Sequence, residues 1–302
     1  MNEIPNLRIG TRGSPLALAQ AHQVQGLLGA MATEIAVIKT TGDKVLDRPL
    51  ADIGGKGLFS KEIDEALLDG RIDIAVHSMK DLETWLPDGI AVAAVLERED
   101  PRDAFISDKA SSLDNLAAGS VIGTSSLRRQ AQILNRRPDL RVATFRGNVQ
   151  TRMKKLGDGE ADATLLALAG LNRLGMADVA AEILEPEILL PAVAQGAIGI
   201  TCRDGDNAAM ESVAALNHGP SQARVTAERA MLAALDGSCR TPIGGLAEIN
   251  EDGVLTLRGL VARADGSEIL EATRSGPVSD AEALGRDAGE ELRGRAGPDF
   301  FE

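Results

Sequence analysis

The sequence predicts an α/β protein with two doubly wound domains and a small α+β third domain. The chain has 302 residues, which is too long for one core. Over its first two-thirds, apolar strands alternate with segments of helical periodicity, and after residue 218 this alternation gives way to apolar runs separated by Asp-Gly turns. We expect domain 1 at 1–98 and 198–217, domain 2 at 99–197 and domain 3 at 218–302.

The first domain begins with a predicted strand at 6–11 and a helix. Ser14 suits the N-cap and Pro15 the first helical position. Apolar residues at steps of four and three continue the helix (Ala17, Ala21, Val24, Leu28, Met31). A strand is predicted at 34–39. Residues 40–57 have many turn formers and little periodicity, which predicts a long loop of the kind that often acts as a lid.

The rest of this domain alternates in the same way. Phe59, Ile63 and Ala66 predict one face of a helix that stops near Gly70. Strands are predicted at 72–76 and 89–96. Because strands alternate with helices, we expect a parallel sheet.

The second domain repeats this design. Residues 120–135 predict strand, turn and helix, and the tripeptide Ile-Gly-Thr at 9–11 recurs at 122–124 in the same context. A strand at 141–145, a helix from about 148 and an apolar segment at 161–170 continue the alternation. Two related halves are therefore expected.

The third domain differs in kind. A helix to about Leu235 leads into "GSCRTP" at 237–242, and Asp252-Gly253 and Asp265-Gly266 separate three apolar runs. Asp-Gly between such runs predicts hairpins, and hence a three-stranded antiparallel meander. Ser279 and Glu282 have the spacing of a capping box and predict the start of a last helix.

Charge and cysteine content exclude several classes of function. The formal net charge is -13 and the pI about 4.8, which argues against general binding to nucleic acid or to a membrane surface. Two cysteines make no disulfide framework and predict a reducing compartment. The sequence has neither a signal-peptide pattern nor an apolar run of membrane-spanning length. We expect a cytoplasmic protein, with no interface stripe that argues for more than a monomer.

A positive segment interrupts this acidic chain. Residues 120–157 contain nine Lys or Arg and one acid, Asp139. Arg128 and Arg129 fall in the first turn of the predicted helix, where the helix dipole already attracts anions, so a carboxylate or phosphate ligand explains them well. One alternative is a solvated helix face, and this interpretation suits Arg136, Arg137, Lys154 and Lys155. Another is a nucleic-acid-binding patch, which the lack of stacking aromatic residues disfavours.

A second cluster follows the strand at 72–76. His77, Ser78, Lys80 and Asp81 come at its carboxyl end, which is where open α/β sheets bind ligands. Lys80 beside Asp81 suits a site that handles both an anion and a developing cation. The alternative is a loop whose charges pair with neighbours. His77 fits a structural role better than that of a base.

Cys239 is the third candidate. Arg240 follows it directly, which favours thiolate character. An ordinary thiol in a turn is an equally good interpretation. The three histidines do not cluster with cysteine, so neither a Cys–His pair nor a zinc site is expected, and we predict no metal. Cys202 is interpreted as structural. Gly57 follows Lys56 where a phosphate-binding loop needs Ser or Thr, so ATP or GTP binding is not expected.

Taken together, these motifs resemble the porphobilinogen deaminase family nearly from end to end. The stretches that carry the resemblance occur in the family's order: "IGTRGSPLALAQ", "GGKGLFSKEI", "DIAVHSMKDL", "GTSSLRRQAQ", "FRGNVQTR", "LALAGLNRLG", "PAVAQGAIGI" and "GSCRTPIGG". The resemblance implies an enzyme that joins four porphobilinogen molecules with loss of ammonia on a covalent dipyrromethane primer. It also implies two domains resembling type II periplasmic binding proteins.

The resemblance assigns roles residue by residue. It makes Cys239 the thioether attachment point for dipyrromethane and Asp81 the catalytic carboxylate that stabilises a cationic azafulvene. Cofactor contacts are implied for Lys80, Asp81, Ser126, Arg128, Arg129 and Arg152. Substrate contacts are implied for Arg12, Ser14, Arg146, Arg152, Arg173 and Gln195. Lys56 and Phe59 match the end of the family's lid.

Three positions depart from the family's pattern. Glu83 replaces a proline, Ala194 a glycine and Thr201 an acid. None of them has a direct chemical role. A non-catalytic protein that binds small carboxylates remains the alternative, because two βα-type halves with an anion site at their junction describe both. Asp81 and Cys239 separate the two hypotheses, since a pure binder needs neither.

Overall fold

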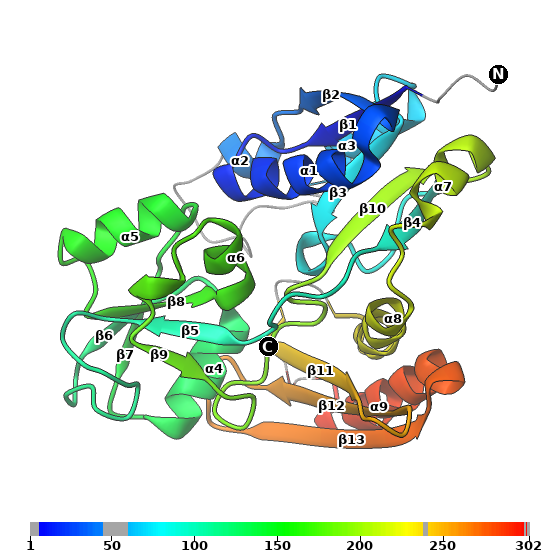
Figure 1. Cartoon of the computed structure of the whole chain (residues 1–302). Helices are drawn as coiled ribbons and strands as arrows, with labels where there is room; N and C mark the ends of the chain where they lie inside the picture. Colours follow the sequence, from blue (N-terminus) through cyan, green and yellow to red (C-terminus); the bar gives the residue numbers. More distant parts are fainter. Residues whose placement is uncertain (1–5, 45–59, 238–240, 299, 301–302) are drawn as a thin grey trace. The chain divides into compact units, whose positions relative to one another are not determined.

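The computed structural model describes residues 6–44, 60–237, 241–298 and 300, and these residues form two compact units (Figure 1). Unit 1 takes its described residues from 6–44, 60–99 and 197–222. Unit 2 takes its described residues from 100 to 196 and from 223 onward.

Unit 1 contains a five-stranded sheet in the order β2-β1-β3-β10-β4. Its strands are β1 (Leu7–Thr11), β2 (Ala32–Val37), β3 (Ile74–Ser78), β4 (Ile90–Val95) and β10 (Ile198–Arg203). β1 runs parallel to β2 and β3, as the alternation predicts. The expectation of a wholly parallel sheet is wrong for β10, which is antiparallel to both its neighbours.

The course of the chain explains this reversal. The chain leaves unit 1 after β4 and returns at Ala197. Ile198 pairs with Ser78 and Gly199 with Val95, so β10 begins at the edge of the sheet where β3 and β4 end. It must therefore run back against them.

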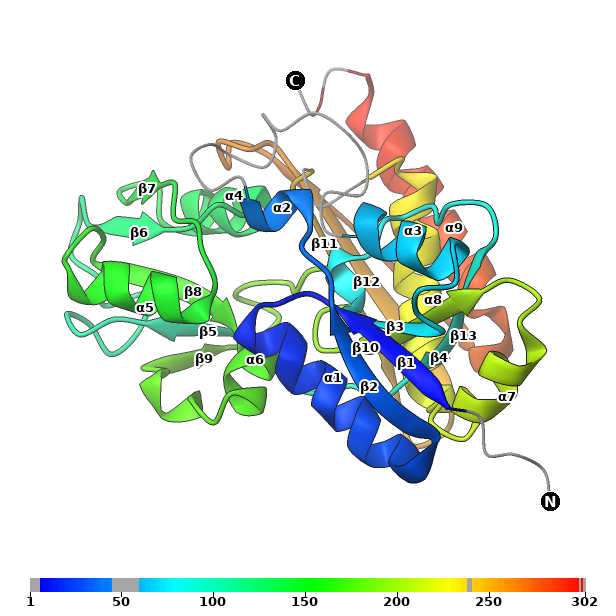
Figure 2. The same cartoon turned by 90° about the horizontal axis from the view of Figure 1, so that it is seen from above.

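Helices cover both faces of this sheet (Figure 2). Helices α1 (Pro15–Leu28) and α7 (Asn207–Ala214) pack on one face through Val24 and Val213, and α3 (Lys61–Leu68) packs on the other through Ile63. The predicted cap is confirmed, since the Ser14 hydroxyl accepts the Ala17 N–H at 3.3 Å. Residues 41–44 form the short helix α2 (Thr41–Lys44) where a loop was expected, and the remainder of that predicted loop lies outside the described residues.

The larger sheet of unit 2 has the order β7-β6-β8-β5-β9. Its strands are β5 (Asp103–Ile106), β6 (Val121–Gly123), β7 (Arg141–Ala143), β8 (Ala163–Ala167) and β9 (Glu182–Leu184). β6 is parallel to β7 and β8, and β5 is antiparallel to β8 and β9. This is the pairing pattern of unit 1, with the two Ile-Gly-Thr stretches on equivalent strands β1 and β6. The shared pattern supports two related halves.

Three helices accompany this sheet: α4 (Leu127–Arg136), α5 (Val149–Gly157) and α6 (Leu168–Arg173). α4 packs on one face through Ile133, against Phe105 and Ile122. α5 and α6 pack on the other face, against Ala104 and Ile106. α4 thereby lies with its N-terminus at the carboxyl end of β6.

The second sheet of unit 2 is the predicted antiparallel meander, which is confirmed. It consists of β11 (Ile243–Ile249), β12 (Val254–Ala262) and β13 (Ile269–Pro277). Helices α8 (Gly219–Ala234) and α9 (Ala281–Ala296) accompany it. The two helices pack so closely that a Cβ on Gly285 of α9 would lie 2.1 Å from the Ala227 carbonyl oxygen. The mixed α/β fold class predicted from the sequence is therefore confirmed.

The capping box predicted for the last helix is wrong. The N-cap of α9 is Asp280, and its side chain makes no capping hydrogen bond. The Ser279 hydroxyl donates instead to the Asp280 carboxylate. A 3-10 turn at Val278–Asp280 precedes the helix and moves its start past Ser279.

The meander holds α4 in place. The Gln130 side-chain amide donates to the Ala264 carbonyl, and the Asn135 amide donates to the Gly266 carbonyl at 2.8 Å. Gly266 has φ +77°, and a Cβ there would lie 2.6 Å from the Asn135 nitrogen, so this turn needs glycine. The helix that carries Arg128 and Arg129 is thus fixed along its far half.

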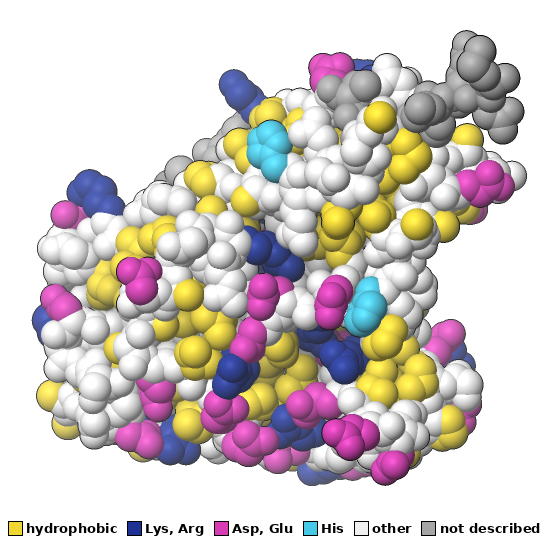
Figure 3. Space-filling model, in the orientation of Figure 1, with side chains coloured by type: hydrophobic (Ala, Val, Ile, Leu, Met, Phe, Trp, Pro, Cys, Tyr) yellow, Lys and Arg dark blue, Asp and Glu magenta, His cyan; other side chains and the backbone are white. Residues whose placement is uncertain are grey.

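Charged side chains of both signs mix on the face of unit 2 over β9 and the meander (Figure 3). Arg258 illustrates this, because it pairs with Glu187 at 2.5 Å and with Glu248 at 3.1 Å. None of the helices in the described part of the chain combines the length and the apolar character that crossing a membrane requires.

Candidate active site

Asp81 lies in unit 1, directly after a buried strand. β3 ends at Ser78, and Met79–Asp81 form one 3-10 turn beyond it. Arg12 Nη1 lies 3.8 Å from Asp81 Oδ2, and the side chains keep 21% and 39% of their surface exposed. Arg12 follows β1, the neighbour of β3 in the sheet, so two adjacent strand ends bring the two opposite charges together.

Gln20 fixes the turn that carries Asp81. This buried side chain of α1 donates from Nε2 to the Ser78 hydroxyl at 2.8 Å, and that hydroxyl donates to Gln20 Oε1 at 3.1 Å. α1 begins at Pro15, just after Arg12 and Ser14. One pair of hydrogen bonds therefore links the helix that follows Arg12 to the turn that ends in Asp81. Sequence reasoning missed Gln20, although its spacing places it on the apolar stripe of α1.

His77 is buried beside this turn. It is 7% exposed, and its Nε2 lies 3.0 Å from Thr201 Oγ1. Burial, together with the nearby positive charge of Arg12, lowers the pKa of His77 to about 4. His77 is therefore neutral at pH 7, which supports the structural role inferred from the sequence. Thr201, one of the three departures from the family pattern, is its hydrogen-bond partner.

Asp64 is an unusual carboxyl group of unit 1 that sequence reasoning missed. It lies on α3, is 4% exposed, and its Oδ1 has no hydrogen-bond partner. Burial raises the pKa of Asp64 to about 6, opposed by a hydrogen bond from Ser60 and assisted by the negative charge of Glu83. Glu83, a second departure from the family pattern, therefore acts on a buried acid of α3.

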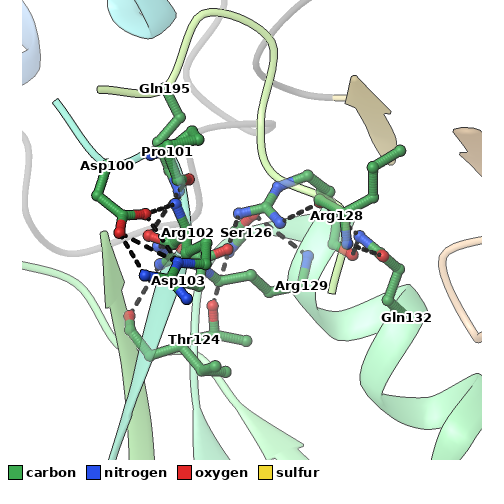
Figure 4. Close-up of polar contacts among 12 residues, drawn as sticks. Asp100, Pro101, Arg102, Asp103, Thr124, Ser126, Arg128, Arg129, Gln132 and Gln195 are labelled. Atoms are coloured by element: carbon green, nitrogen blue, oxygen red, sulfur yellow. Dashed lines mark hydrogen bonds and ion pairs between the residues drawn. The ribbon is translucent and has the colours of Figure 1, made fainter. Parts of the chain in front are cut away.

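Arg128 and Arg129 lie at the start of α4 in unit 2 and share one carboxylate (Figure 4). Arg128 Nη2 donates to Asp103 Oδ2 at 2.7 Å, and Arg129 Nη2 donates to Asp103 Oδ1 at 2.6 Å. Their Nη1 atoms donate to the carbonyls of Leu190 and Leu165. All three charged side chains are buried. The Nε–H groups of both arginines are buried donors without a hydrogen-bond partner.

Ser126 is the N-cap of the same helix. Its hydroxyl accepts the Arg129 N–H at 3.4 Å, and its own N–H donates to the Thr124 hydroxyl. Because α4 begins shortly after β6 ends, the two arginines lie at the carboxyl end of β6. Burial lowers the pKa of Arg128, and the charge of Asp103 opposes that shift.

Gln195 joins the same cluster from a different part of unit 2. Its Nε2 donates to the Pro101 carbonyl at 2.7 Å and to Asp103 Oδ1 at 3.0 Å. Asp103 itself was missed by sequence reasoning. The signal available in the sequence was an acid at the start of the apolar run "DAFI". Sequence alone does not distinguish such a buried, paired acid from an ordinary exposed acid at the end of a strand.

The other predicted arginines are spread over unit 2. Arg146 is buried just before Gly147, and Arg152 Nε on α5 donates to the Gly147 carbonyl at 2.9 Å. Arg173 ends α6 and donates to the Gly196 carbonyl at 2.7 Å, directly after Gln195. Arg173 and Gln195 therefore meet the same short stretch of chain, and Arg146 and Arg152 share another.

The remaining predicted site residues have these places. Lys80 is half-buried within the turn Met79–Asp81. Cys239, Lys56 and Phe59 lie outside the described residues. In the described part of the chain, no three His, Cys, Asp or Glu side chains are grouped so as to hold a metal ion.

The four basic residues assigned to a solvated helix face each make an ion pair, and they differ in exposure. Arg136 pairs with Asp114 at 2.7 Å, and Lys155 with Glu160 at 3.7 Å. Arg137 pairs with Asp139, and Lys154 with Asp158. The prediction is confirmed for Arg136 and Lys154, which are exposed, and Lys155 is half-buried. It is wrong for Arg137, whose side chain is 16% exposed and donates to the carbonyls of Leu113 and Leu116.

Ala194, the third departure, adopts a left-handed backbone conformation with φ +58°. Its N–H donates to Glu228 Oε2 at 2.5 Å, and Glu228 Oε1 accepts the Ala247 N–H at 2.7 Å. Glu228 is fully buried on α8. One carboxylate thus joins the segment before Gln195 to the meander.

Comparison with known proteins identifies relatives of this chain. Residues 7–211 match the model of "Porphobilinogen deaminase, dipyromethane cofactor binding domain", and residues 222–294 match that of "Porphobilinogen deaminase, C-terminal domain". The porphobilinogen deaminase of Paracoccus denitrificans is 56% identical over 100% of this chain and 99% of its own length. The chloroplastic porphobilinogen deaminase of rice, Oryza sativa subsp. japonica, is 56% identical over 98% of this chain and 86% of its own length.

Among solved structures, a periplasmic substrate-binding protein of an ABC transporter from Coxiella burnetii matches 70% of this chain and 91% of its own, with a TM-score of 0.43 and 15% identity. The sequence relatives and the two family models carry the assignment: this chain belongs to the porphobilinogen deaminase family.

Proposed function

We propose that Asp81 is the catalytic carboxylate, that Cys239 carries the cofactor, and that the arginines of unit 2 bind carboxylates of cofactor and substrate. The overall reaction follows from the family. The chain is a transferase that polymerises four porphobilinogen molecules, with loss of ammonia, into hydroxymethylbilane on a dipyrromethane cofactor, in tetrapyrrole biosynthesis. This assignment decides against the alternative of a non-catalytic carboxylate-binding protein.

The proposed role of Asp81 is electrostatic. Loss of ammonia from porphobilinogen leaves a positive charge, and a carboxylate that also accepts pyrrole N–H groups stabilises it. The support is that the Asp81 side chain is 39% exposed and that Arg12 stands 3.8 Å away, a distance that leaves the carboxylate oxygens accessible. The same carboxylate is suited to moving the protons of each condensation.

The proposed role of the arginines is carboxylate recognition. When bound, dipyrromethane supplies a pyrrole carbon that acts as the nucleophile for the first condensation. Each pyrrole carries an acetate and a propionate, and a guanidinium group binds carboxylates in bidentate fashion. The observation that carries this proposal is the pair of buried Nε–H donors on Arg128 and Arg129, because buried donors without a partner are rare in folded proteins. The donor set therefore fits a group with several carboxylates.

The remaining assignments extend these two roles. Lys80, Ser126 and Arg152 are proposed to hold the cofactor together with Asp81, Arg128 and Arg129. Arg12, Ser14, Arg146, Arg152, Arg173 and Gln195 are proposed to bind the substrate. Lys56 and Phe59 are proposed to belong to a lid.

We also propose that the chain is organised as three domains and acts as a cytoplasmic monomer. The three sheets support the first part, because each has its own strand order and its own helices. Light scattering on the purified protein tests the oligomeric state, and cell fractionation tests the location.

Intact-mass spectrometry tests the cofactor assignment. The purified protein should exceed its sequence mass by a two-pyrrole adduct, and Cys239→Ser should lack that adduct. Cys202→Ser is the matched control, since Cys202 is the other thiol and is buried in unit 1. An adduct that persists in Cys239→Ser would show that another residue carries the cofactor. Added porphobilinogen should increase the mass of the wild-type protein in steps of one pyrrole unit.

A further inference from the structure

Asp103 is a fully buried carboxylate at the first position of β5. It accepts hydrogen bonds from Arg128 and Arg129, one on each oxygen, at 2.7 and 2.6 Å, and from Gln195 at 3.0 Å. A buried carboxylate is costly unless it is paired and hydrogen-bonded, and these donors satisfy that requirement.

The two arginines would not converge without a shared partner. Neighbouring residues on a helix point about 100° apart, and two guanidinium groups repel each other. Asp103 draws the two Nη2 atoms to the two oxygens of one carboxylate, while Leu190 and Leu165 accept from the two Nη1 atoms. Each guanidinium is therefore held at two points, which fixes the direction of its remaining N–H groups.

The charges and donors of this cluster do not balance among the residues that hold them. Two guanidinium groups face one carboxylate, and both Nε–H groups lack a hydrogen-bond partner. An excess of positive charge and of buried donors favours a ligand that brings further carboxylate oxygens.

The same carboxylate also contacts the linker segments of the chain. The chain passes between units 1 and 2 at residues 99–100 and again at 196–197. Gln195, directly before the second passage, donates both to Asp103 and to the carbonyl of Pro101, directly after the first. The orientation of the arginine pair is thereby tied, on the side of unit 2, to the linkers at 99–100 and 196–197.

We propose that Asp103 is a positioning residue for the reaction: it holds Arg128 and Arg129 in the orientation that receives cofactor and substrate carboxylates, and it couples that orientation to the linkers through Gln195. This inference depends on the carboxylate-binding roles proposed above for the two arginines. Asp103 acts through these arginines and does not touch the reacting atoms.

The first test is Asp103→Asn. The amide keeps the shape of the side chain but presents only one acceptor oxygen, so one guanidinium loses its partner. We expect KM for porphobilinogen to rise roughly tenfold or more, with a smaller change in kcat, because carboxylate binding is lost while Asp81 is untouched. We also expect the fraction of protein that carries the two-pyrrole adduct to fall, as measured by intact mass without any turnover.

Asp114→Asn is the matched control. Asp114 pairs with Arg136, which lies on α4 like Arg128 and Arg129. This pair is at the surface, and 57% of the Asp114 side chain is exposed. It should leave KM and adduct fraction at wild-type values. If Asp103→Asn lowers the melting temperature but leaves KM and adduct fraction of the folded protein unchanged, Asp103 is merely structural and the inference is overturned.

A double variant covers the case in which Asp103→Asn does not fold. Arg128→Gln removes one positive charge. When Asp103→Asn is added to it, only one guanidinium group faces the neutral amide, so the repulsion between two buried cations is absent. The double variant should have a higher KM than Arg128→Gln alone, because Arg129 then faces a neutral amide in place of the carboxylate that holds it. Equal KM values in the two proteins would overturn the inference.

The arginines themselves separate this inference from the proposal beneath it. If Arg128→Gln and Arg129→Gln both keep wild-type KM and adduct fraction, the proposed carboxylate-binding roles fail, and the inference fails with them. If both variants are impaired while folded Asp103→Asn is not, only the inference about Asp103 fails.

Discussion

Arg12 Nη1 lies 3.8 Å from Asp81 Oδ2 in unit 1, which is an ion-pair distance and too long for a hydrogen bond. Both residues follow neighbouring parallel strands, and Gln20 and Ser78 lock the turn between β3 and Asp81. The fold thus delivers a partly exposed carboxylate with a cation close by. A carboxylate held in this way is available to a substrate cation without first breaking a short hydrogen bond.

Asp81→Asn should reduce the turnover of porphobilinogen by about 10²- to 10⁴-fold, because the amide neither balances a positive charge nor takes up a proton. Folding should be preserved, since the side chain is 39% exposed. The rate of hydroxymethylbilane formation measures the effect, and circular dichroism measures the fold.

Asp69→Asn is the control for this variant. Asp69 is an exposed acid of unit 1 that pairs with Arg71 at 2.8 Å and has no place in the proposed site. Its turnover should equal that of the wild type. Turnover of Asp81→Asn within a factor of two of the wild type would rule out the assigned role.

Short-range signals in the sequence predicted local structure well, with the capping box at Ser279 as the exception. Ser14 caps α1 as predicted, because a serine before an apolar run has a specific backbone donor within reach. Ser126 caps α4 in the same way, although the cap was not predicted. Asp265-Gly266 was predictable because the turn requires a positive φ that glycine supplies. These features depend on a few neighbouring residues, so one sequence is enough to reveal them.

Long-range contacts could not be predicted in this way. Asp103 and Arg128 are 25 residues apart in the chain, and Gln195 is 92 residues from Asp103. Which acid pairs with which arginine is decided by the insertion of β5 between β8 and β9, an antiparallel pairing that the alternation of strands and helices does not reveal. The motifs identified the arginines, and only the fold identified their partner.

His77 should make the protein less stable in acid. Its pKa is lowered to about 4 in the folded state, whereas an unfolded histidine has its pKa near 6.5. Between these values the unfolded state binds a proton that the folded state does not, so stability is fully present above pH 6.5 and is lost as the pH falls toward 4. The loss from this one group is about 3 kcal/mol at most.

Urea unfolding of wild type and His77→Gln from pH 4 to pH 7.5 measures this effect. The variant should show a shallower decline in the free energy of unfolding below pH 6.5. His22→Gln, which removes an exposed histidine from α1, should follow the wild-type curve. Parallel curves for wild type and His77→Gln would contradict the neutral state of the buried ring.

Asp64 should have the opposite dependence on pH. Burial raises the pKa of Asp64 to about 6, so the folded state keeps a proton that the unfolded state has lost. Its contribution is favourable in acid and is lost as the pH rises from about 4 to about 6. Asp64→Asn removes an ionisable group without changing its size, and it should stabilise the protein at pH 7 by roughly 1–3 kcal/mol.

Unfolding at pH 4 supplies the internal control for Asp64→Asn. In the folded protein Asp64 is then protonated and, like asparagine, neutral, so the gain in the free energy of unfolding should be smaller than at pH 7. Glu83→Gln should give a smaller gain at pH 7, since the charge of Glu83 only adds to the effect of burial on Asp64. A variant Asp64→Asn that is less stable than the wild type at both pH values would show that the carboxyl group is ionised and paired.

Ala194→Gly should stabilise unit 2. Ala194 has φ +58°, a region that costs a residue with a Cβ about 1–2 kcal/mol and costs glycine little. Part of this gain is offset by the greater freedom of glycine in the unfolded chain, so the net increase in the free energy of unfolding should be about 1 kcal/mol or less. The comparison variant is Asp236→Gly. Asp236 also has a positive φ of 52°, but aspartate tolerates this region better, so this variant should gain less stability than Ala194→Gly.

Thermal unfolding of both variants measures the difference. A loss of stability in Ala194→Gly would mean that the packing of the buried methyl group outweighs the backbone strain.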